Sequence, residues 1–245
     1  MFKISKRLCT ASQYVRSGAI VADIGTDHAY LPIYLALEGK IKKAVAADIN
    51  EGPLNTAREN IKKYSCEHII DTYLTNGLKG IEGFNPTDIV ICGMGGELIA
   101  NILEASKELV SNSSIRLILQ PMTMIRELRE YLSNGFSTIA ENIVFEDDKL
   151  YQIMCVEYDG VKHALTNAQL ELGPKNIENG GEFYERLLFS TIAKKQKKLD
   201  GKRLGGQDTT EVESELLELL ELSKEIKKWR FMNSIINYQK CIQLR

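Results

Sequence analysis

One turn near the amino terminus constrains the fold of this chain more than any other feature of its sequence. The apolar residues 21–24 break at Gly25 and the apolar pattern restarts at residue 29, while Asp23 and Asp27 flank the glycine. A strand that ends in a glycine turn before a helix is typical of the nucleotide-binding corner of doubly wound α/β folds. Because two carboxylates would repel a pyrophosphate, the turn favours a ligand that carries positive charge.

S-adenosylmethionine has the charges that this turn favours, since its amino group and its sulfonium are both positive. A dinucleotide is the competing ligand, but its fingerprint requires three glycines and only Gly25 is present here. A plain strand-to-helix turn, with carboxylates that cap the helix, is the purely structural alternative. The nicotinamide-dependent oxidoreductase that a dinucleotide would imply is therefore disfavoured.

Three further apolar runs end in polar or glycine-rich turns. Residues 44–47 lead to Asp48, at the spacing where doubly wound sheets place the acid that binds ribose hydroxyls. Residues 69–74 lead to Asn76, which suits an adenine edge and is equally common in an ordinary turn. Residues 88–92 lead into the glycine-rich residues 93–96, where the backbone can approach a ligand closely. The carboxyl ends of parallel strands share one edge of a sheet, so these turns predict a single ligand crevice.

The motifs together resemble those of the bacterial tRNA (adenine-22-N1)-methyltransferases, which are class I S-adenosylmethionine-dependent enzymes with a helical C-terminal extension. The resemblance covers nearly the whole chain and is carried by residues 4–8, 23–28, 30–32, 47–49, 76–78, 93–96 and 119–121. It implies methyl transfer to N1 of adenine 22 in tRNA.

The same resemblance implies a role for each turn. The methionine part of the cofactor would lie against Asp23, Gly25, Thr26 and Asp27. The ribose would lie against Asp48 with Ile49, and the adenine against Asn76 with Gly77. The fourth turn would place Gly93 and Met94 against the cofactor and Gly95 and Gly96 near the target base.

The expected chemistry needs no general base, because adenine N1 is a pyridine-type nitrogen with a free lone pair. Enzymes that methylate exocyclic amines often carry Asn or Asp, two prolines and an aromatic residue after the fourth strand, and residues 92–95 differ from that pattern. Asp27 is a candidate to stabilise the cationic product. His28 is a candidate for catalysis or for a local hydrogen bond, and Tyr30 for stacking on the target base or for packing in the core.

The hydrophobic pattern predicts an α/β fold of the Rossmann-like class I methyltransferase type. Strands and helices alternate through residue 121, and residues 122–134 predict a helix. Residues 136–145 and 150–158 then predict an antiparallel hairpin that completes a seven-stranded sheet with a reversed last strand. From residue 164 the pattern becomes helical, and residues 182–204 and 211–244 predict an antiparallel helical hairpin. We therefore expect a methyltransferase domain over residues 1–163 and a helical domain over residues 164–245.

Two apolar stripes predict how the helices of the hairpin pack against each other. The stripes could pack within one chain or between two chains, so we expect a monomer or a weak dimer. They comprise Phe183, Leu187, Leu188, Ile192 and Leu199, and Val212, Leu216, Leu219, Ile226 and Trp229.

Composition excludes several other classes of protein. No run approaches the ~20 apolar residues of a membrane span, and polar residues 10–13 interrupt the basic amino terminus before a secretion signal could form, so a cytoplasmic protein is expected. Five cysteines without a C-x-x-C pair and three widely spaced histidines predict neither disulfides nor a metal site.

Charge gives two candidate RNA contacts, although the net charge is only −2. A basic set on the amino-terminal helix comprises Lys3, Lys6, Arg7 and Arg16, and the resemblance implies that it lies near the mouth of the ligand crevice. Arg7 is the leading candidate for binding phosphate or substrate, and a solvated charge is the alternative. The second is a basic cluster at residues 194–203, which could instead pair with the glutamates of residues 211–218. A non-catalytic RNA-binding protein with a vestigial nucleoside pocket stays open as a further alternative.

Overall fold

The computed structural model describes the backbone of residues 2–243 and the side chains of residues 2–226. The chain divides into two compact units between Leu165 and Thr166.

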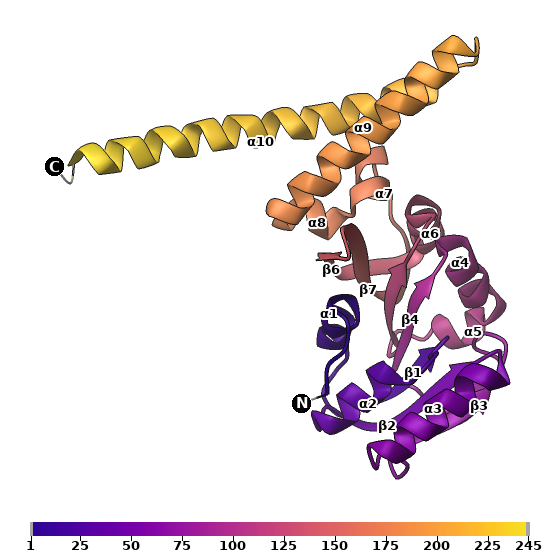
Figure 1. Cartoon of the computed structure of the whole chain (residues 1–245). Coiled ribbons are helices and arrows are strands. Elements are labelled where there is room, and N and C mark those ends of the chain that lie inside the picture. Colours follow the sequence, from indigo (N-terminus) through magenta and orange to yellow (C-terminus); the bar gives the residue numbers. More distant parts are fainter. Residues whose placement is uncertain (1, 244–245) are drawn as a thin grey trace. The chain divides into compact units, whose positions relative to one another are not determined.

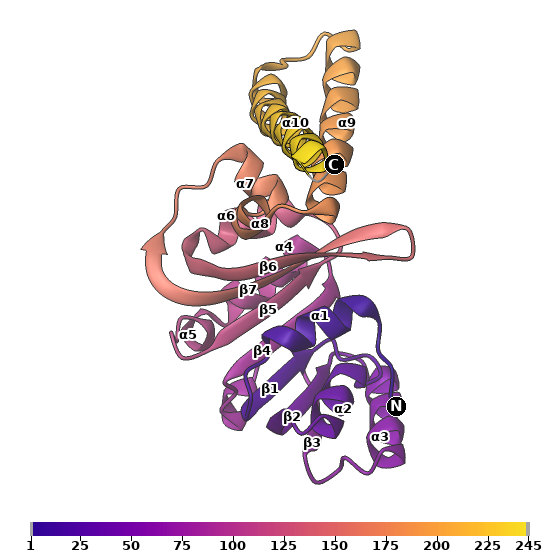
Figure 2. The ribbon, with the colours of Figure 1, turned by 90° about the vertical axis from the view of Figure 1, so that its left-hand side faces the viewer.

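The first unit is built on one seven-stranded sheet with the order β3-β2-β1-β4-β5-β7-β6 (Figure 1). Its five parallel strands are β1 (Ala19–Ile24), β2 (Ile41–Asp48), β3 (Ile70–Leu74), β4 (Asp88–Met94) and β5 (Arg116–Pro121). β7 (Lys149–Lys162) runs antiparallel both to β5 and to the edge strand β6 (Asn134–Glu146), as Figure 2 shows. The predicted seven-stranded sheet with a reversed last strand is confirmed.

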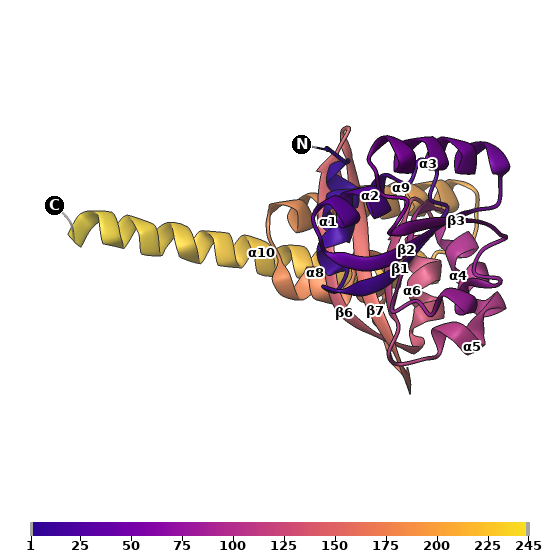
Figure 3. The same cartoon turned by 90° about the horizontal axis from the view of Figure 1, so that it is seen from below.

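Helices cover both faces of this sheet (Figure 3). One face packs against α1 (Lys6–Tyr14), α2 (Tyr30–Leu37) and α3 (Glu51–Lys63). The other packs against the 3-10 helix η1 (Ile81–Phe84), α4 (Gly96–Ala105), α5 (Lys107–Val110) and α6 (Ile125–Leu132). Successive residues of a parallel strand point to opposite faces, so the central strands are apolar almost throughout. The two cores hold the carboxyl ends of the strands at fixed positions along one edge.

The helix and the hairpin that follow β5 differ in their bounds from the sequence prediction, and the helix ends at Leu132 instead of residue 134. The helix expected from residue 122 begins at Ile125, since Met124 adopts a left-handed conformation with φ 52°. The loop before it is held by hydrogen bonds from Met122 N to Met94 O (2.7 Å) and from Gly96 N to Thr123 O (2.8 Å). The strands of the hairpin extend beyond the expected residues at both ends. At the turn each strand gains one residue, because the turn needs only Asp147 and Asp148, both with positive φ.

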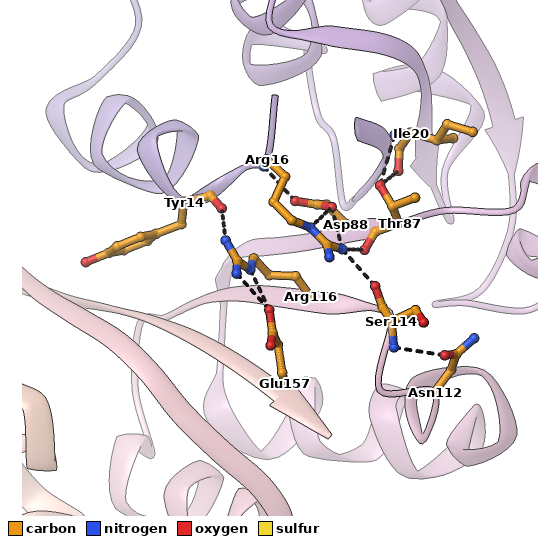
Figure 4. A network of polar contacts seen from close by, with 9 residues as sticks. All are labelled: Tyr14, Arg16, Ile20, Thr87, Asp88, Asn112, Ser114, Arg116 and Glu157. Carbon is orange, nitrogen blue, oxygen red and sulfur yellow. Dashed lines mark hydrogen bonds and ion pairs between the residues drawn. The ribbon is translucent and has the colours of Figure 1, made fainter. Parts of the chain in front are cut away.

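A polar network at the amino ends of β4 and β5 fixes the end of α1 (Figure 4). Arg16 Nε lies 2.9 Å from Oδ1 of the fully buried Asp88, and the Arg16 backbone N–H donates to Oδ2 of the same carboxylate. Beside it, Arg116 pairs with Glu157 at 2.7 Å. The expectation that Arg16 belongs to a basic set near the ligand crevice is therefore wrong, because this residue forms an ion pair at the opposite edge of the sheet.

The second unit is helical and contains α7 (Asn167–Leu172), α8 (Pro174–Asn179), α9 (Glu182–Leu204) and α10 (Thr210–Gln243). Leu199 of α9 packs against Val212 and Leu216 of α10, as the apolar stripes predict. Lys195 crosses between helices to Glu171 (2.6 Å) and Glu215 (2.7 Å).

One member of the predicted stripes, Phe183, departs from the expected packing. Phe183 is 38% exposed, and it lies against the guanidinium of Arg186 rather than in the helical core. The side chain of Trp229 lies outside the described residues.

Candidate active site

The first turn of the site is held closed by the neighbouring strand. The backbone N–H groups of Gly25 and Thr26 both donate to Ala47 O, at 2.9 and 3.0 Å. The carboxylate of Asp23 is buried. Its Oδ2 accepts a hydrogen bond from the neutral hydroxyl of Thr26 at 2.7 Å. Gly25 has φ 71°, a conformation that favours glycine.

The turn continues through two strained residues that flank His28. Asp27 and Ala29 have φ of 53° and 57°, and non-glycine residues in this region commonly cluster at functional sites. His28 Nε2 lies 3.3 Å from Asp27 Oδ2, while Asp27 itself is largely exposed. Among the described residues His28 Nδ1 is buried and has no hydrogen-bond partner. Asn60 Nδ2 donates to His28 O (3.0 Å) and holds the backbone of the turn.

The edge carries an excess of buried negative charge. Burial raises the pKa of Asp23 to about 6, the hydrogen bond from Thr26 opposes this, and the neighbouring charge of Asp48 raises the pKa further. Within the part of the chain that the structure describes, neither carboxylate forms an ion pair with a basic side chain. A ligand with positive charge would therefore be stabilised at this edge.

Asp48 ends β2 and presents a carboxylate beside an apolar surface. Its Oδ1 accepts the backbone N–H of Asn50 at 2.9 Å, which fixes the side chain and leaves Oδ2 available. The next residue, Ile49, is 59% exposed, an unusual environment for an isoleucine that follows a buried strand.

Asn76 and Gly77 follow β3 and lie next to Asp48, because Thr75 N donates to Asp48 O (2.9 Å). Asn76 is exposed, and Gly77 packs against Ile102 of α4. Both line a cavity of about 1030 Å³ that extends along α4 and α5.

The glycine-rich loop after β4 meets the first turn directly. A Cβ on Gly25 would lie 2.2 Å from Met94 Cε, so the Met94 side chain covers the turn. Gly93 has φ 83°. Gly95 and Gly96 instead pack against the loop before α6, where a Cβ on Gly96 would lie 2.0 Å from Met124 O. The structure thus gives these last two glycines a packing role whether or not a base lies near them.

Arg7 reaches the same loop from α1. Its Nη1 lies 3.6 Å from the position that a Cβ on Gly93 would occupy, and it donates to Oε1 of the fully buried Gln120 at 3.0 Å. Gln120, which sequence reasoning did not propose as a site residue, lies next to the end of β5, and its Nε2 donates to Pro121 O (2.9 Å). The available signal was a polar residue at the end of the apolar run of residues 117–119.

Tyr30 begins α2 and is 42% exposed, so it is not a core residue. Its ring lies 5.2 Å from the His28 ring and 6.0 Å from that of Phe2, measured between centroids.

Residues 2–226 contain no group of three His, Cys, Asp or Glu side chains arranged to hold a metal ion. No helix in the described part of the chain has the length and apolar character needed to cross a membrane.

The sheet order and the turns at its carboxyl edge define a Rossmann-like methyltransferase, and a family model described as a methyltransferase domain matches residues 4–154. A curated relative, the tRNA (adenine(22)-N(1))-methyltransferase of Bacillus subtilis, is 39% identical over 180 residues, which are 70% of this chain and 74% of the relative. The chain belongs to this tRNA (adenine(22)-N(1))-methyltransferase family.

Solved structures agree with this assignment. The chain is similar to Streptococcus pneumoniae Sp1610 in complex with S-adenosyl-L-methionine, with a TM-score of 0.79, 33% identity, and coverage of 90% of this chain and 99% of that one. It is also similar to the TrmK protein of M. capricolum in complex with S-adenosyl-homocysteine, with a TM-score of 0.71, 30% identity, and coverage of 92% and 97%.

Proposed function

We propose that this chain transfers the methyl group of S-adenosylmethionine to N1 of adenine 22 in tRNA. The observation that carries the proposal is the buried acidic edge, where Asp23 and Asp48 lie beside glycine turns with no basic ion-pair partner among the described residues. The name of the Bacillus subtilis relative and the ligand of the pneumococcal structure support the substrate and the cofactor. Neither relative supports the oxidoreductase alternative or the vestigial-pocket alternative.

The residues at the edge fit this cofactor. The buried carboxylate of Asp23, with Thr26 and Asp27 beside it, suits the positive methionine end. The free oxygen of Asp48 suits ribose hydroxyls, and the exposed Ile49 offers an apolar surface to the adenine. Asn76 and Gly77 suit the adenine edge. Gly25 and Gly93 would let the backbone approach the ligand, and the Met94 side chain lies beside Gly25.

The work of the protein residues is to bind and orient. When bound, S-adenosylmethionine supplies an electrophilic methyl group on a positively charged sulfur. Adenine N1 loses no proton when it attacks, so no side chain has to act as a general base. Alignment of reacting groups is worth up to about 7 to 11 kcal/mol in favourable systems. Positive φ at Asp27 and at Ala29 fixes the backbone of the turn that carries Asp27 and His28.

We assign Asp27 and His28 of this turn, and Tyr30 at the start of α2, to the target base. The exposed carboxylate of Asp27 can stabilise the positive charge that methylation places on the adenine, and His28 lies 3.3 Å from it. The exposed ring of Tyr30 offers a stacking surface next to His28. Gly95 and Gly96 would shape the floor of the base site through their close packing on the loop before α6.

The test is methyl transfer from labelled S-adenosylmethionine to unmodified tRNA, followed by nucleoside analysis. We expect 1-methyladenosine with a tRNA that carries adenine at position 22 and none with the matched transcript that carries guanine there. Cofactor binding without transfer to either tRNA would contradict the proposed substrate, and equal methylation of both transcripts would contradict the proposed position.

A further inference from the structure

The methionine end of the cofactor carries two opposite charges, an ammonium and a carboxylate, and the acidic groups described above account only for the first. Arg7 is a basic side chain that reaches the same edge. Its Nη1 lies 3.6 Å from the position of a Cβ on Gly93, the glycine after β4. Cys92, one residue earlier, is influenced by both groups: burial raises the pKa of its thiol, the charge of Asp23 raises it further, and the charge of Arg7 lowers it. The acid and the base therefore lie near the same end of β4.

Contacts on several sides fix the guanidinium of Arg7. Its Nη1 donates to Gln120 Oε1 (3.0 Å) and lies 3.6 Å from Met122 Sδ. Its Nε lies 3.7 Å from Glu146 Oε2, and its carbon Cζ lies 5.6 Å from the centre of the Tyr151 ring. Among the described residues its Nη2 has no hydrogen-bond partner. A guanidinium held in this way keeps two N–H donors for a ligand at little further cost in side-chain entropy.

We propose that Arg7 binds the carboxylate of the methionine end of the cofactor, while Asp23 binds its ammonium. The proposal rests on the proposed function and replaces the expectation that Arg7 binds phosphate. In this arrangement each charge of the zwitterionic methionine end lies beside an opposite charge of the protein.

An RNA phosphate fits the same position less well. It would bring negative charge to an edge that already holds Asp23, Asp48 and Glu146, and it carries no ammonium to offset them. Charge-assisted hydrogen bonds from a guanidinium to a carboxylate are among the stronger polar contacts in proteins. Gln120 and Glu146 then act as positioning residues, because they hold Arg7 from the ends of β5 and β6.

The test uses the full chain without RNA and measures affinity by calorimetry. The ligands are S-adenosylmethionine and its decarboxylated form, which lacks only the carboxylate. Arg7→Met is expected to weaken S-adenosylmethionine binding by about tenfold to a hundredfold and to leave the affinity for the decarboxylated form unchanged. Unchanged affinity for the decarboxylated form would also show that the variant is folded.

Lys6→Met is the matched control, since it removes one positive charge from the same turn of α1 and its side chain is exposed. It is expected to bind both ligands as the parent does. An equal loss of affinity for both ligands in Arg7→Met would overturn the proposal. Unchanged cofactor affinity together with loss of tRNA binding would also overturn it, and would assign Arg7 to RNA. A failure of the parent chain to methylate tRNA while this ligand pattern holds would contradict the proposed function alone.

Discussion

Among single residues, Asp23 ties the electrostatics of the site most directly to pH. Its folded-state pKa of about 6 exceeds the ordinary value of 3.8, so the folded chain binds this proton more tightly than the unfolded chain does. Its contribution to stability without ligand therefore increases as pH falls from about 6 towards 4. A cationic ligand favours the ionised carboxylate, so cofactor affinity should change in the opposite direction.

We expect the affinity for S-adenosylmethionine to rise between about pH 5 and 7 and then to level off, because Asp23 ionises over this range. Calorimetric titrations at several pH values would measure it. Asp23→Asn keeps an acceptor for the Thr26 hydroxyl and removes the titration. This variant should bind more weakly and with a flatter pH profile, and a profile as steep as that of the parent would assign the pH dependence to another group.

Asp48 offers a second test with a close control. Asp48→Asn keeps an oxygen for the Asn50 N–H but removes the charge, so we expect cofactor binding to weaken by about 1.5 to 3 kcal/mol. Asp71→Asn changes an exposed carboxylate on the adjacent strand β3 and should leave the affinity unchanged. Equal affinity of the parent and Asp48→Asn in equilibrium dialysis would contradict the ribose assignment.

The residues of the site were predictable to different degrees. An acid that directly follows an apolar run marks the end of a strand, which is why Asp23 and Asp48 could be proposed from the sequence. The contacts of Gln120 and Glu146 with Arg7 could not be predicted from the sequence. Both residues lie more than a hundred positions from Arg7, and the contacts depend on how α1 packs against β5 and the hairpin. Local sequence patterns carry no information on such long-range packing.

Among the elements, the loop after β4 is constrained by backbone rather than by side chains. Gly96→Ala would place a Cβ 2.0 Å from Met124 O, and a carbonyl at the start of a helix cannot turn aside as a flexible side chain can. We expect a loss of about 1 to 3 kcal/mol in unfolding free energy. Gly52→Ala, at an open position in α3, should instead gain about 0.5 to 1 kcal/mol. Urea unfolding would measure both, and similar changes in the two variants would contradict this reasoning.

Helix boundaries show where sequence patterns succeed and where they fail. The bounds of α9 follow from its periodic apolar residues and the glycines on either side. The start of α6 does not, because it follows the left-handed Met124, whose carbonyl packs against Gly96 of a loop distant in sequence. The short helix α7 was missed although Thr166 and Gln169 form a capping box, a signal that is legible in the sequence.

At the scale of the whole molecule, the small net charge hides where basic side chains are free to bind RNA. Lys195 and Arg203 of the basic cluster are paired with glutamates, as the alternative from the sequence anticipates. Lys194, Lys197 and Lys198 are exposed, and no described residue pairs with them. Their spacing of three and four residues puts them on one face of α9, which makes this face the proposed contact with the tRNA backbone.

The triple variant Lys194→Gln, Lys197→Gln and Lys198→Gln should therefore bind tRNA more weakly and with a shallower salt dependence. Each lysine that contacts a phosphate should account for about one unit of the slope of log affinity against log salt. Cofactor affinity should stay at the parent value, because the substitutions lie in the second unit. The matched control changes Lys42, Lys43 and Lys62, three exposed lysines of the first unit, and removes the same charge. An equal loss of tRNA affinity in both variants would mean that binding depends on net charge alone, and the α9 face would then have no special role.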